Sequence, residues 1–407
     1  MPGASRSLTV AHLTTVDVSL RFLLLAQLRA VRDAGGVAIG ISAPGPHVPA
    51  LEREGIRHIP LSSSTRSADP RADLRAAREL YAVLRRERVD VLHTHNPKPG
   101  VYGRVVGRLA RVPIVVNTVH GLYATEDDPW AKRLPVYSLE AAAARCSDAE
   151  LYQNPEDLAL AERWRLTRHA RLLGNGVDLD RFDVRRVSDH RRRAERDALG
   201  ATDDTVLVGA VGRLVAGKGY PELFEAMASL DPQRYRLVVA GSEDPEKADA
   251  LTTTALDEAR ARGVVFAGHR DDVEPLYAAM DLFVLASHRE GFPRAAMEAA
   301  AMSRAAVATD IRGCRQVVDG GRTGLLVPPR DPPALAAAIE QLGGDPELRR
   351  RMGGAARARA EAEFDERRVV ERVHAAYLDA ARRKGVTAVT ATLGHGSASV
   401  RHIGPGR

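Results

Sequence analysis

The sequence predicts an α/β protein with two doubly wound, Rossmann-like domains that face each other across a cleft. Short apolar runs alternate with amphipathic stretches, which is typical of a parallel sheet with helices on both faces. The same alternation begins a second time near residue 206. The chain has 407 residues, too many for one ordinary hydrophobic core.

The expected elements follow from the spacing of the apolar residues. Runs of consecutive apolar residues between Gly, Pro and polar residues predict buried strands. A helix is expected over 20–33, where Leu24, Leu28 and Val31 share one face, and another over 74–86. The strands are expected at 8–13, 37–42, 89–93, 113–118, 149–152, 170–173, 206–211, 237–240, 264–266, 282–285 and 306–309.

The domain borders are expected where the composition changes. An N-terminal domain is expected over 1–190 and a C-terminal domain over 191–365, because 184–199 is charged and weakly apolar, as in a linker with a lead-in helix. The tail 386–407 is rich in Gly, Ser and Thr and is expected to be disordered. A C-terminal helix at 366–385 is expected to pack back on the N-terminal domain. Further helices are expected over 335–342, 346–363 and 369–381.

The composition argues against several classes of protein. The sequence has no run of eighteen apolar residues and no apolar signal-peptide core, which predicts a cytoplasmic protein without a membrane-spanning helix. Cys146 and Cys314 lie in different predicted domains, so neither a disulfide framework nor a Cys zinc site is expected.

Positive charge is concentrated in the first part of the chain. Up to Arg111 there are 17 basic and 9 acidic residues, and after it 42 and 44. The Arg-rich segment 71–88 predicts peripheral contact of the N-terminal domain with the cytoplasmic face of an anionic inner membrane. The alternative is an Arg-rich surface that faces only solvent. Nucleic acid is not expected as a partner, because no zinc-finger spacing, RNP-type motif or long Lys/Arg block occurs.

Two loops carry residues suited to a phosphorylated ligand that is rich in hydroxyls. The strand at 206–211 ends in Gly212-Arg213, and Lys218 follows before a helix; Gly allows close approach to phosphate, and the cations supply charge. Downstream, Glu290 and Glu298 flank a strand-to-helix turn whose free N–H groups can bind an anion. Each cation or carboxylate alone would be an ordinary surface residue, but together they predict a nucleotide-sugar site.

With these motifs the sequence resembles the retaining glycosyltransferases of family 4, which have the two-domain GT-B fold. The resemblance rests on Gly212-Arg213 with Lys218-Gly219, on Glu290 to Glu298 and on Asn175-Gly176-Val177-Asp178, and it extends over about 8–381. Among them it is most similar to capsular and exopolysaccharide glycosyltransferases that act on lipid-linked acceptors. The resemblance implies that the first domain binds the acceptor and the second binds the nucleotide-sugar.

The resemblance also implies roles in donor binding. Arg213 and Lys218 would hold the diphosphate and stabilise the departing nucleoside diphosphate. Glu298 would accept hydrogen bonds from the ribose, and Glu290 would bind hydroxyls of the transferred sugar. The nucleobase is expected near Gly268-His269-Arg270. The other residues expected to bind the donor are Gly212, Gly291, Phe292, Pro293, Asn175 and Gly176, with His269 and Arg270.

Other loops are expected to face the transferred sugar or the acceptor. By resemblance, His120, which follows the strand 113–118, contacts the transferred sugar near the reacting carbon; the alternative is a structural histidine. Lys98 lies in a loop that resembles the one expected to seat an acceptor diphosphate; the alternative is an exposed lysine. The loop 14–19 lacks the Gly-Gly pair of many relatives, so Thr14, Ser19 or Arg21 would act through their side chains.

No metal site is expected. His93 and His95 share one face of a strand, which could suggest a metal, but no third ligand appears at a familiar spacing. Glu126-Asp127-Asp128-Pro129 is expected to be a solvated loop; the alternative is a carboxylate cluster. No Asp-x-Asp motif ends a predicted strand. The resemblance implies a metal-independent reaction with no cofactor besides the donor substrate.

The predicted function is transfer, with retention, of a hexose or N-acetylhexosamine from a nucleoside-diphosphate sugar, expected to be UDP-linked. The expected acceptor is a hydroxyl of a polyprenyl-diphosphate-linked saccharide in cell-surface polysaccharide synthesis. Two alternatives remain open. A nucleotide-sugar 2-epimerase would need acid/base residues around the sugar and no acceptor surface. A non-catalytic scaffold would bind a membrane or a polyanion and keep an inactive nucleotide site.

Overall fold

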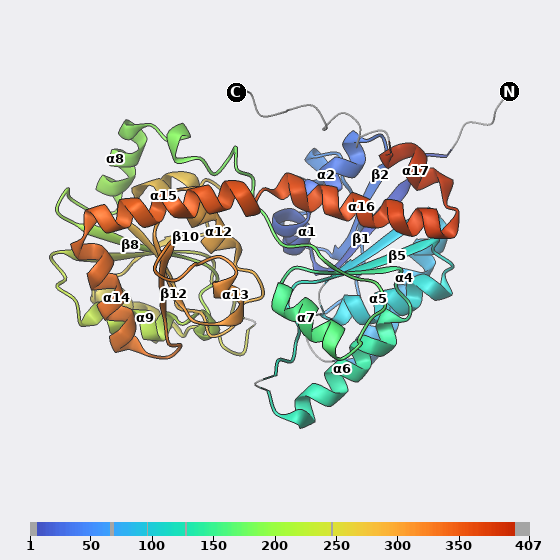
Figure 1. The fold of residues 1–407 in the computed structure, drawn as a ribbon, viewed down its shortest axis with the longest axis horizontal. Coiled ribbons are helices and arrows are strands. Elements are labelled where there is room, and N and C mark those ends of the chain that lie inside the picture. Colours follow the sequence, from blue (N-terminus) through green and yellow to red (C-terminus); the bar gives the residue numbers. More distant parts are fainter. Residues whose placement is uncertain (1–5, 66–68, 96, 127, 246, 395–407) are drawn as a thin grey trace. The chain divides into compact units, whose positions relative to one another are not determined.

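The computed structural model describes residues 6–65, 69–95, 97–126, 128–245 and 247–394. The chain forms two compact units, one made of Met1–Gly174 and Arg367–Arg407 and the other of Asn175–Glu366. Each unit contains one parallel sheet with helices on both of its faces (Figure 1). The predicted pair of doubly wound α/β domains is therefore confirmed.

The sheet of the first unit has seven parallel strands in the order β3-β2-β1-β4-β5-β6-β7. The order reverses between β1 and β4, and ligands of doubly wound sheets bind at the carboxyl ends of the strands at such a switch point. The strands are β1 (Thr9–Val16), β2 (Val37–Ala43), β3 (Arg57–Pro60), β4 (Val91–His95), β5 (Ile114–Val119), β6 (Ala149–Tyr152) and β7 (Ala170–Leu172).

Helices cover both faces of this sheet. On one face α1, α2, α16 and α17 enclose a core that includes Leu28, Val373 and Tyr377. On the other face α4 and α5 enclose a second core around Leu80, Leu84 and Val106. The helices of this unit are α1 (Asp17–Leu23), α2 (Leu25–Asp33), α3 (Val48–Arg53), α4 (Pro70–Glu87), α5 (Pro97–Leu109), α6 (Trp130–Ala144), α7 (Pro155–Arg163), α16 (Glu366–Lys384) and α17 (Thr387–Leu393).

The sheet of the second unit has six parallel strands in the order β10-β9-β8-β11-β12-β13, so its switch point lies between β8 and β11. The strands are β8 (Val206–Val211), β9 (Tyr235–Ala240), β10 (Val265–Gly268), β11 (Leu282–Leu285), β12 (Ala306–Thr309) and β13 (Gly324–Val327). The helices are η1 (Val184–Arg186), α8 (Asp189–Ala198), η2 (Ala216–Lys218), α9 (Tyr220–Ala228), α10 (Thr253–Ala261), α11 (Glu274–Ala279), α12 (Arg294–Ala301), α13 (Arg312–Arg315), α14 (Pro332–Gly344) and α15 (Pro346–Glu363).

The expected domain border at residue 190 is wrong, because residues 175–190 belong to the second unit. The backbone of Val177 pairs with Phe364 and Glu366, with N–O distances of 2.8 and 3.1 Å. The ring of Phe182 is buried against Tyr277, and its carbonyl accepts a 2.7 Å hydrogen bond from Arg357. These contacts bind the segment to the second unit although its composition resembles that of a linker.

Three smaller expectations also differ from the structure. The helix expected over 20–33 is broken at Leu24, where φ is −121° and ψ is −4°. Strands β3 and β13 were not expected. Part of the tail expected to be disordered forms α17, because Val389 and Leu393 are buried in the core of the first unit; residues 395–407 lie outside the described part.

No helix among the described residues has the length and apolar character that a membrane span needs. Cys146 and Cys314 lie in different units, and both are free thiols.

Candidate functional site

The loop after β8 is held tightly against the end of β11. Gly219 has a φ of +72°, and a Cβ atom at this position would lie 1.9 Å from the carbonyl oxygen of Ala286. Only glycine fits such a close approach. The Tyr220 hydroxyl also donates a 2.9 Å hydrogen bond to the carbonyl of Gly212. The backbone between Gly212 and Tyr220 is thereby fixed at the switch point of the second sheet.

Lys218 and Glu290 meet at this switch point. The Nζ of Lys218 lies 2.5 Å from Oε1 of Glu290, and the hydroxyl of Ser287 donates to the same oxygen at 2.7 Å. Both side chains of the ion pair are mostly buried. The sequence predicted Lys218 and Glu290 as site residues, but it gave no sign that Ser287 would hold the carboxylate.

Arg213 lies in the same loop and is more open. Its Nη1 donates a 2.9 Å hydrogen bond to Oδ2 of Asp244, which follows β9, and 47% of its side chain is exposed. Its guanidinium keeps further N–H donors beyond the one that meets Asp244. Arg213 and Lys218 thus place two cations in one short loop beside carboxylates that position them.

Glu298 lies in α12 and has two polar partners. Its Oε2 accepts a 3.0 Å hydrogen bond from the Tyr277 hydroxyl, and its Oε1 accepts a 2.9 Å bond from Nε of Arg294. Burial first and then the charge of Glu298 raise the pKa of Tyr277 well above its usual value, so Tyr277 stays protonated and donates. A carboxylate on an otherwise apolar helix needs polar partners, and the second unit provides them for Glu298.

The turn before α12 is tied to the start of the second unit. Nδ2 of Asn175 donates to the carbonyl of Phe292 at 3.3 Å, and the ring of Phe292 packs edge-on against Phe364. Close packing requires glycine at position 176, because a Cβ atom there would lie 2.7 Å from the backbone of Glu366. Gly291 precedes this turn, and Pro293 lies at the N-cap of α12. The motif at 175–178 thus positions the predicted donor-binding turn.

The side chains of His269 and Arg270 lie beside acidic residues. The guanidinium of Arg270 forms ion pairs with Glu195 of α8 and with Asp272, and the imidazole of His269 lies 3.8 Å from Asp271. The carbonyl of Gly268 accepts a 2.8 Å hydrogen bond from the N–H of Gly241. The side chain of Arg270 is therefore committed to structural contacts.

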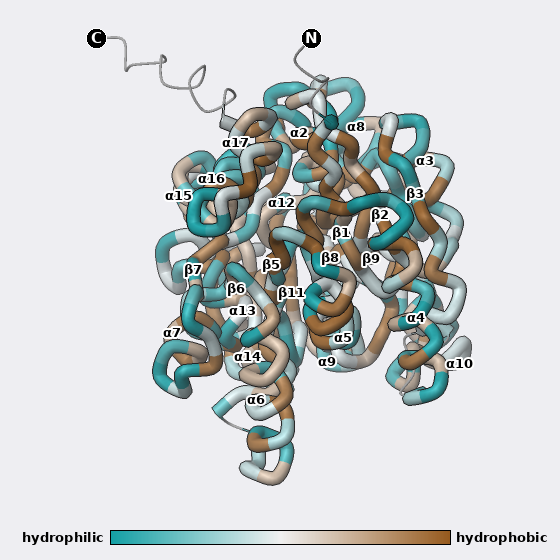
Figure 2. The backbone as a smooth tube through the Cα atoms, turned by 90° about the vertical axis from the view of Figure 1, so that its right-hand side faces the viewer, coloured by the Kyte–Doolittle hydropathy of each residue, from teal (hydrophilic) through white to brown (hydrophobic). Residues whose placement is uncertain are grey.

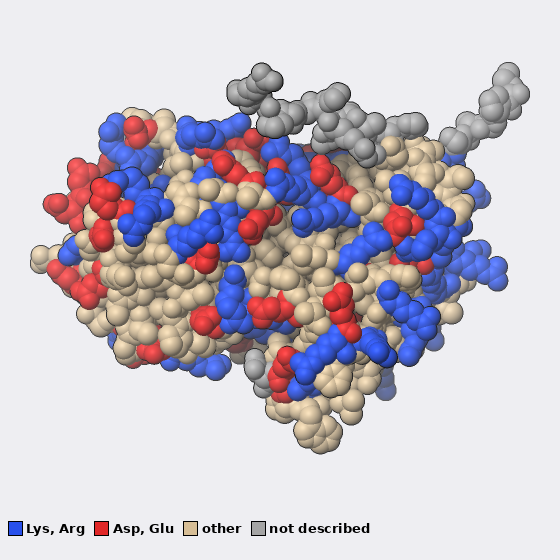
Figure 3. Space-filling model, in the orientation of Figure 1, with Lys and Arg blue, Asp and Glu red and all other residues tan. Residues whose placement is uncertain are grey.

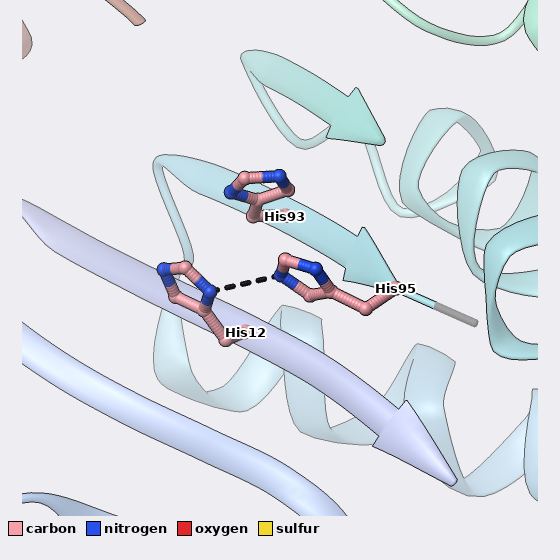
Figure 4. Close-up of side chains that lie close together, drawn as sticks. All are labelled: His12, His93 and His95. Atoms are coloured by element: carbon pink, nitrogen blue, oxygen red, sulfur yellow. Dashed lines mark hydrogen bonds between the residues drawn. The ribbon is translucent and has the colours of Figure 1, made fainter. Parts of the chain in front are cut away.

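A cluster of buried histidines lies at the switch point of the first sheet. β1 and β4 are neighbours, and their register places His12 directly opposite His93. Figure 4 shows His12 on β1 beside His93 and His95 on β4; Nδ1 of His12 lies 3.0 Å from Nε2 of His95. The sequence shows no third ligand at a familiar spacing from His93 and His95, but strand pairing brings His12 to them.

The cluster continues as a chain of hydrogen bonds. Nδ1 of His95 lies 3.1 Å from Nε2 of His120, and Nδ1 of His120 lies 3.1 Å from Oε1 of Gln153. The Gln153 oxygen can only accept, so Nδ1 of His120 donates to it and Nε2 of the neutral His120 ring accepts. Nδ1 of His95 therefore donates to His120, and by the same reasoning Nδ1 of His12 donates to Nε2 of His95. Both ring nitrogens of His120 are thus engaged within the first unit.

At the other end of this chain stands Tyr377 of α16. Its hydroxyl lies 2.7 Å from Nδ1 of His93 and 3.4 Å from Nε2 of His12, while Nε2 of His93 lies 2.7 Å from the Thr118 hydroxyl. Burial lowers the pKa of His12 to about 3 and that of His120 to about 4. Burial also lowers the pKa values of His93 and His95 well below the usual value. The rings are therefore neutral at pH 7.

The three imidazoles of His12, His93 and His95 are close enough to suggest a metal site, because one ring nitrogen of each lies within 4.8 Å of the others. Their hydrogen bonds do not fit one. Both nitrogens of His93 face hydroxyl groups, and those of His12 and His95 face each other, Tyr377 and His120. A bound metal would have to break these hydrogen bonds.

The residues expected to bind the acceptor lie at or just after the carboxyl ends of β1 and β4, which are neighbours in the sheet. Lys98 lies in the first turn of α5, where its Nζ is 2.6 Å from Asp73 of α4 and 3.2 Å from the carbonyl of Thr65. Thr14 is not in a loop: β1 extends to Val16, and the buried Thr14 hydroxyl donates to the carbonyl of Val16 at 2.9 Å. Direct contact of Thr14 with an acceptor is therefore wrong for this structure.

Ser19 and Arg21 are in better positions. Both lie in α1 and are partly exposed, and the guanidinium of Arg21 lies over the ring of Phe22. In the loop expected to be solvated, Glu126 pairs with Arg163 and Asp128 pairs with Lys132; Asp127 lies outside the described residues.

Comparison with known families identifies glycosyltransferase models on both units. The model described as Glycosyltransferase Family 4 matches residues 25–181, and the model described as Glycosyl transferases group 1 matches residues 205–345. EpsD of Bacillus subtilis (strain 168), which carries a glycosyltransferase name, is 32% identical over 320 residues that cover 76% of this chain and 82% of that protein. The capsular polysaccharide biosynthesis glycosyltransferase CapM of Staphylococcus aureus is 26% identical and covers 90% of this chain and 96% of its own.

Other relatives and solved structures agree. The UDP-Gal:α-D-GlcNAc-diphosphoundecaprenol α-1,3-galactosyltransferase of Escherichia coli is 28% identical over 67% of this chain and 71% of its own. The structure of HepE from Anabaena in complex with UDP and glucose superposes with a TM-score of 0.74 at 20% identity, over 90% of this chain and 98% of that one. A glycosyltransferase from Rickettsia africae superposes with a TM-score of 0.76 at 19% identity, over 92% and 99%. These structures share the GT-B fold with this chain.

Proposed function

Because the chain belongs to glycosyltransferase family 4, we propose that it transfers a hexose or N-acetylhexosamine, with retention, from a UDP-sugar to a hydroxyl acceptor. The observation that carries this proposal is the group at the switch point of the second sheet. There Lys218 is paired with Glu290, and Arg213 lies in the same loop. Two cations suit a diphosphate, and a carboxylate suits sugar hydroxyls.

The chemistry of this proposal is electrostatic. As the bond from the anomeric carbon to the diphosphate breaks, negative charge develops on the departing phosphate oxygens. Arg213 and Lys218 would stabilise that charge because the tight loop around Gly219 fixes their backbone before the reaction begins. The N–H groups in the first turn of α12 would add to the same effect. None of these steps requires a metal ion or a further cofactor.

The remaining donor contacts follow from the same arrangement. Glu298 would accept hydrogen bonds from the ribose, with Tyr277 and Arg294 fixing its carboxylate. Glu290 would bind hydroxyls of the transferred sugar while it orients Lys218. His120 would contact the transferred sugar, and to use a ring nitrogen it would have to give up its bond to Gln153 or to His95.

For the acceptor we propose a polyprenyl-diphosphate-linked saccharide in cell-surface polysaccharide synthesis. The E. coli relative is named for a diphosphoundecaprenol-linked substrate, and CapM is named for capsular polysaccharide biosynthesis. Lys98 would meet the acceptor diphosphate by exchanging its Asp73 partner for phosphate. Peripheral contact of the first unit with an anionic membrane surface belongs to the same proposal.

A donor screen tests this function. The purified chain is incubated with a panel of nucleoside-diphosphate sugars and short polyprenyl-diphosphate saccharides, and the released nucleotide is measured. Acceptor-dependent release of UDP supports the proposal. Epimer formation from donor alone would instead support a 2-epimerase. Binding to vesicles without any turnover or nucleotide-dependent thermal stabilisation would support a scaffold.

The acceptor assignment has its own test. Lys98→Ala should weaken the apparent affinity for a lipid-diphosphate acceptor and leave the affinity for the donor unchanged. Unchanged acceptor affinity in this variant would remove Lys98 from the acceptor site without touching the donor site.

A further inference from the structure

The buried histidines are joined with three other polar side chains into one continuous series of hydrogen bonds. This histidine network consists, in order, of Thr118, His93, Tyr377, His12, His95, His120 and Gln153. Figure 2 shows how apolar the strands around β1 and β5 are, and in Figure 3 charged side chains cover much of the visible surface. Among the described residues, no buried nitrogen or oxygen of the network lacks a hydrogen-bond partner. A polar network in such an interior is stable only when every donor finds an acceptor, so the direction of each bond can be worked out.

The Thr118 end of the network sets the direction of the first bonds. In the described part of the chain the buried Thr118 hydroxyl has one side-chain partner, Nε2 of His93 at 2.7 Å. If His93 donated this bond, the hydroxyl proton would be buried without an acceptor, so Thr118 donates and Nδ1 of His93 carries the ring proton. Nδ1 of His93 then donates to the Tyr377 oxygen at 2.7 Å, and Tyr377 donates to Nε2 of His12 at 3.4 Å. The proton of His12 is therefore on Nδ1.

The Gln153 end leads to the same assignment. Its amide oxygen accepts from Nδ1 of His120, and the bonds behind His120 lead through His95 to a proton on Nδ1 of His12. The two assignments start from opposite ends and meet at His12 without conflict, which also supports the orientation of the Gln153 amide. The network thus has one direction, in which each ring donates through Nδ1 and accepts through Nε2.

His120 is the histidine of the network that a ligand can reach. The three other rings are fully buried, whereas His120 is partly exposed. His120 and Gln153 follow the neighbouring strands β5 and β6 at their carboxyl ends. The backbone N–H of Gln153 donates to the carbonyl of Val119 at 3.2 Å, which ties the two loops together. A ligand at the carboxyl ends of the strands can therefore meet His120 without disturbing the interior of the network.

The two hydrogen bonds of His120 differ in what their loss would cost. If His120 gave up His95, the Nδ1–H of the fully buried His95 would be left without an acceptor. If His120 gave up Gln153, every bond behind it would stay in place, and a ligand oxygen could accept the Nδ1 proton instead. The bond to Gln153 is therefore the one that can be exchanged for a ligand.

We propose that Gln153 and His95 are positioning residues that hold His120 with its proton on Nδ1, and that a hydroxyl oxygen of the transferred sugar replaces the Gln153 oxygen as the acceptor of this proton. The inference rests on the proposed function, which brings the sugar to His120. It assigns the direction of that contact: His120 donates to the sugar and does not accept from it. A sugar with an ammonium group at this position would be rejected, because ammonium can only donate.

The first test needs no substrate. In the nitrogen NMR spectrum of the protein with isotope-labelled histidine, protonated and unprotonated ring nitrogens have different chemical shifts. The signals of His120, identified by their loss in His120→Gln, should show the proton on Nδ1. The exposed His190 of α8 serves as the reference and should show both tautomers. A His120 proton on Nε2 would overturn the proposal.

The second test asks whether the network positions the proton of His120 from behind. In Gln153→Met the proton should stay on Nδ1, because His95 still donates to Nε2. Adding His95→Leu should divide the proton between both nitrogens, whereas adding His95→Gln, whose amide can also donate and accept, should restore Nδ1. A divided proton in Gln153→Met alone would exclude His95 as a positioning residue. This single variant decides the point even if the buried His95→Leu does not fold.

The third test measures the exchange by calorimetry. Gln153→Met should bind the UDP-sugar identified by the donor screen about two- to tenfold more tightly, because Gln153 no longer competes with the sugar oxygen for one proton. UDP alone has no sugar and serves as the matched ligand, so its affinity should stay the same. Weaker binding of the UDP-sugar, or an equal change for UDP, would mean that Gln153 only supports the structure and would overturn the exchange.

Donor analogues separate a donating from an accepting His120. Each sugar hydroxyl is replaced in turn by hydrogen and by fluorine, which can accept a hydrogen bond but cannot donate one. At the contacted position hydrogen should weaken binding clearly more than fluorine, and the difference should disappear in His120→Ala. Equal losses at every position would contradict donation by His120. If no nucleotide-sugar binds at all, the proposed function fails and the exchange fails with it, while the tautomer measured without substrate is judged by the first test.

Discussion

Lys218 and Glu290 form an ion pair of 2.5 Å that joins the loop after β8 to the loop after β11, and the Ser287 hydroxyl holds the same carboxylate oxygen at 2.7 Å. The pair therefore stands where the strand order of the second sheet reverses. In the proposed function, Lys218 would already be in position before the donor phosphate binds, because its carboxylate partner fixes the cation.

Replacing Lys218 by Ala should lower turnover by about 100-fold or more, because the leaving diphosphate loses one of its two cations. The measurement is the rate of acceptor-dependent UDP release at saturating donor. Arg350→Ala, which removes an exposed cation of α15 paired with Glu347, should leave turnover unchanged. Turnover of Lys218→Ala near that of the unchanged chain would exclude Lys218 from the reaction.

Replacing Glu290 by Gln should affect binding and turnover in opposite directions. The variant removes the charge that neutralises Lys218, so UDP should bind about three- to tenfold more tightly by calorimetry. Turnover should nevertheless fall, because the sugar hydroxyls lose their charged acceptor. Weaker UDP binding in this variant would show that Glu290 supports the diphosphate site only as a structural partner of Lys218.

Replacing Tyr277 by Phe should raise the KM for the donor about fivefold and change kcat little. The substitution removes one hydrogen bond that orients Glu298, and such a bond is worth about 1 kcal/mol. Tyr235→Phe is the matched control, because the buried hydroxyl of Tyr235 has no hydrogen-bond partner among the described residues. A fall in kcat at constant KM would argue that Glu298 acts on the reacting sugar and not on the ribose.

The free energy of unfolding should fall as the pH falls from about 6.5 toward 4. His12 and His120, with pKa values of about 3 and about 4, stay neutral in the folded chain, whereas in the unfolded chain histidines take up protons below about 6.5. Their stabilising contribution is therefore complete above that pH and is lost below it, by up to about 1.4 kcal/mol per pH unit for each histidine.

Denaturant unfolding at several pH values measures this slope. The variant His12→Gln should show a shallower slope between pH 6.5 and 4, because one buried histidine is removed. The exposed His190 of α8 serves as the control, and His190→Asn should leave the slope unchanged. An equal slope for His12→Gln and the unchanged chain would mean that other groups dominate the acid response.

The sequence predicted the interior of both sheets well. Strands such as β8 and β11 are buried on both faces, so they appear as continuous apolar runs at the expected positions. Strand β3, with the sequence Arg-His-Ile-Pro, lies at the edge of its sheet and has only one fully buried residue. Such a strand is held by its neighbour β2 and has no apolar pattern of its own.

The domain border could not be found locally, because it depends on contacts between distant residues. Val177 pairs with Phe364 across 187 positions of the chain, and nothing near Val177 announces that partner. The charged segment that follows looked like a linker for the same reason. The composition of a segment indicates how exposed it is. It does not indicate which unit its few buried residues pack against.

The site was predicted in part. Arg213, Lys218, Glu290 and Glu298 stood out because charged residues beside strand ends and in an apolar helix need a reason to be there. Their partners Asp244, Ser287 and Tyr277 are ordinary polar residues that gave no such signal. His12 was missed because a single histidine in an apolar strand becomes informative only when the register of β1 against β4 is known.

The placement of Tyr377 has a consequence for how the chain is made. Tyr377 and the rest of α16 fill the core of the first unit, although almost the whole second unit lies before them in the sequence. During synthesis, the first unit therefore cannot complete its folding until its last helices have been made. The second unit can complete its folding earlier. Until α16 leaves the ribosome, one apolar face of the first sheet stays exposed. The first unit, although it is synthesised first, is therefore the part of the nascent chain that needs protection from aggregation for the longest time.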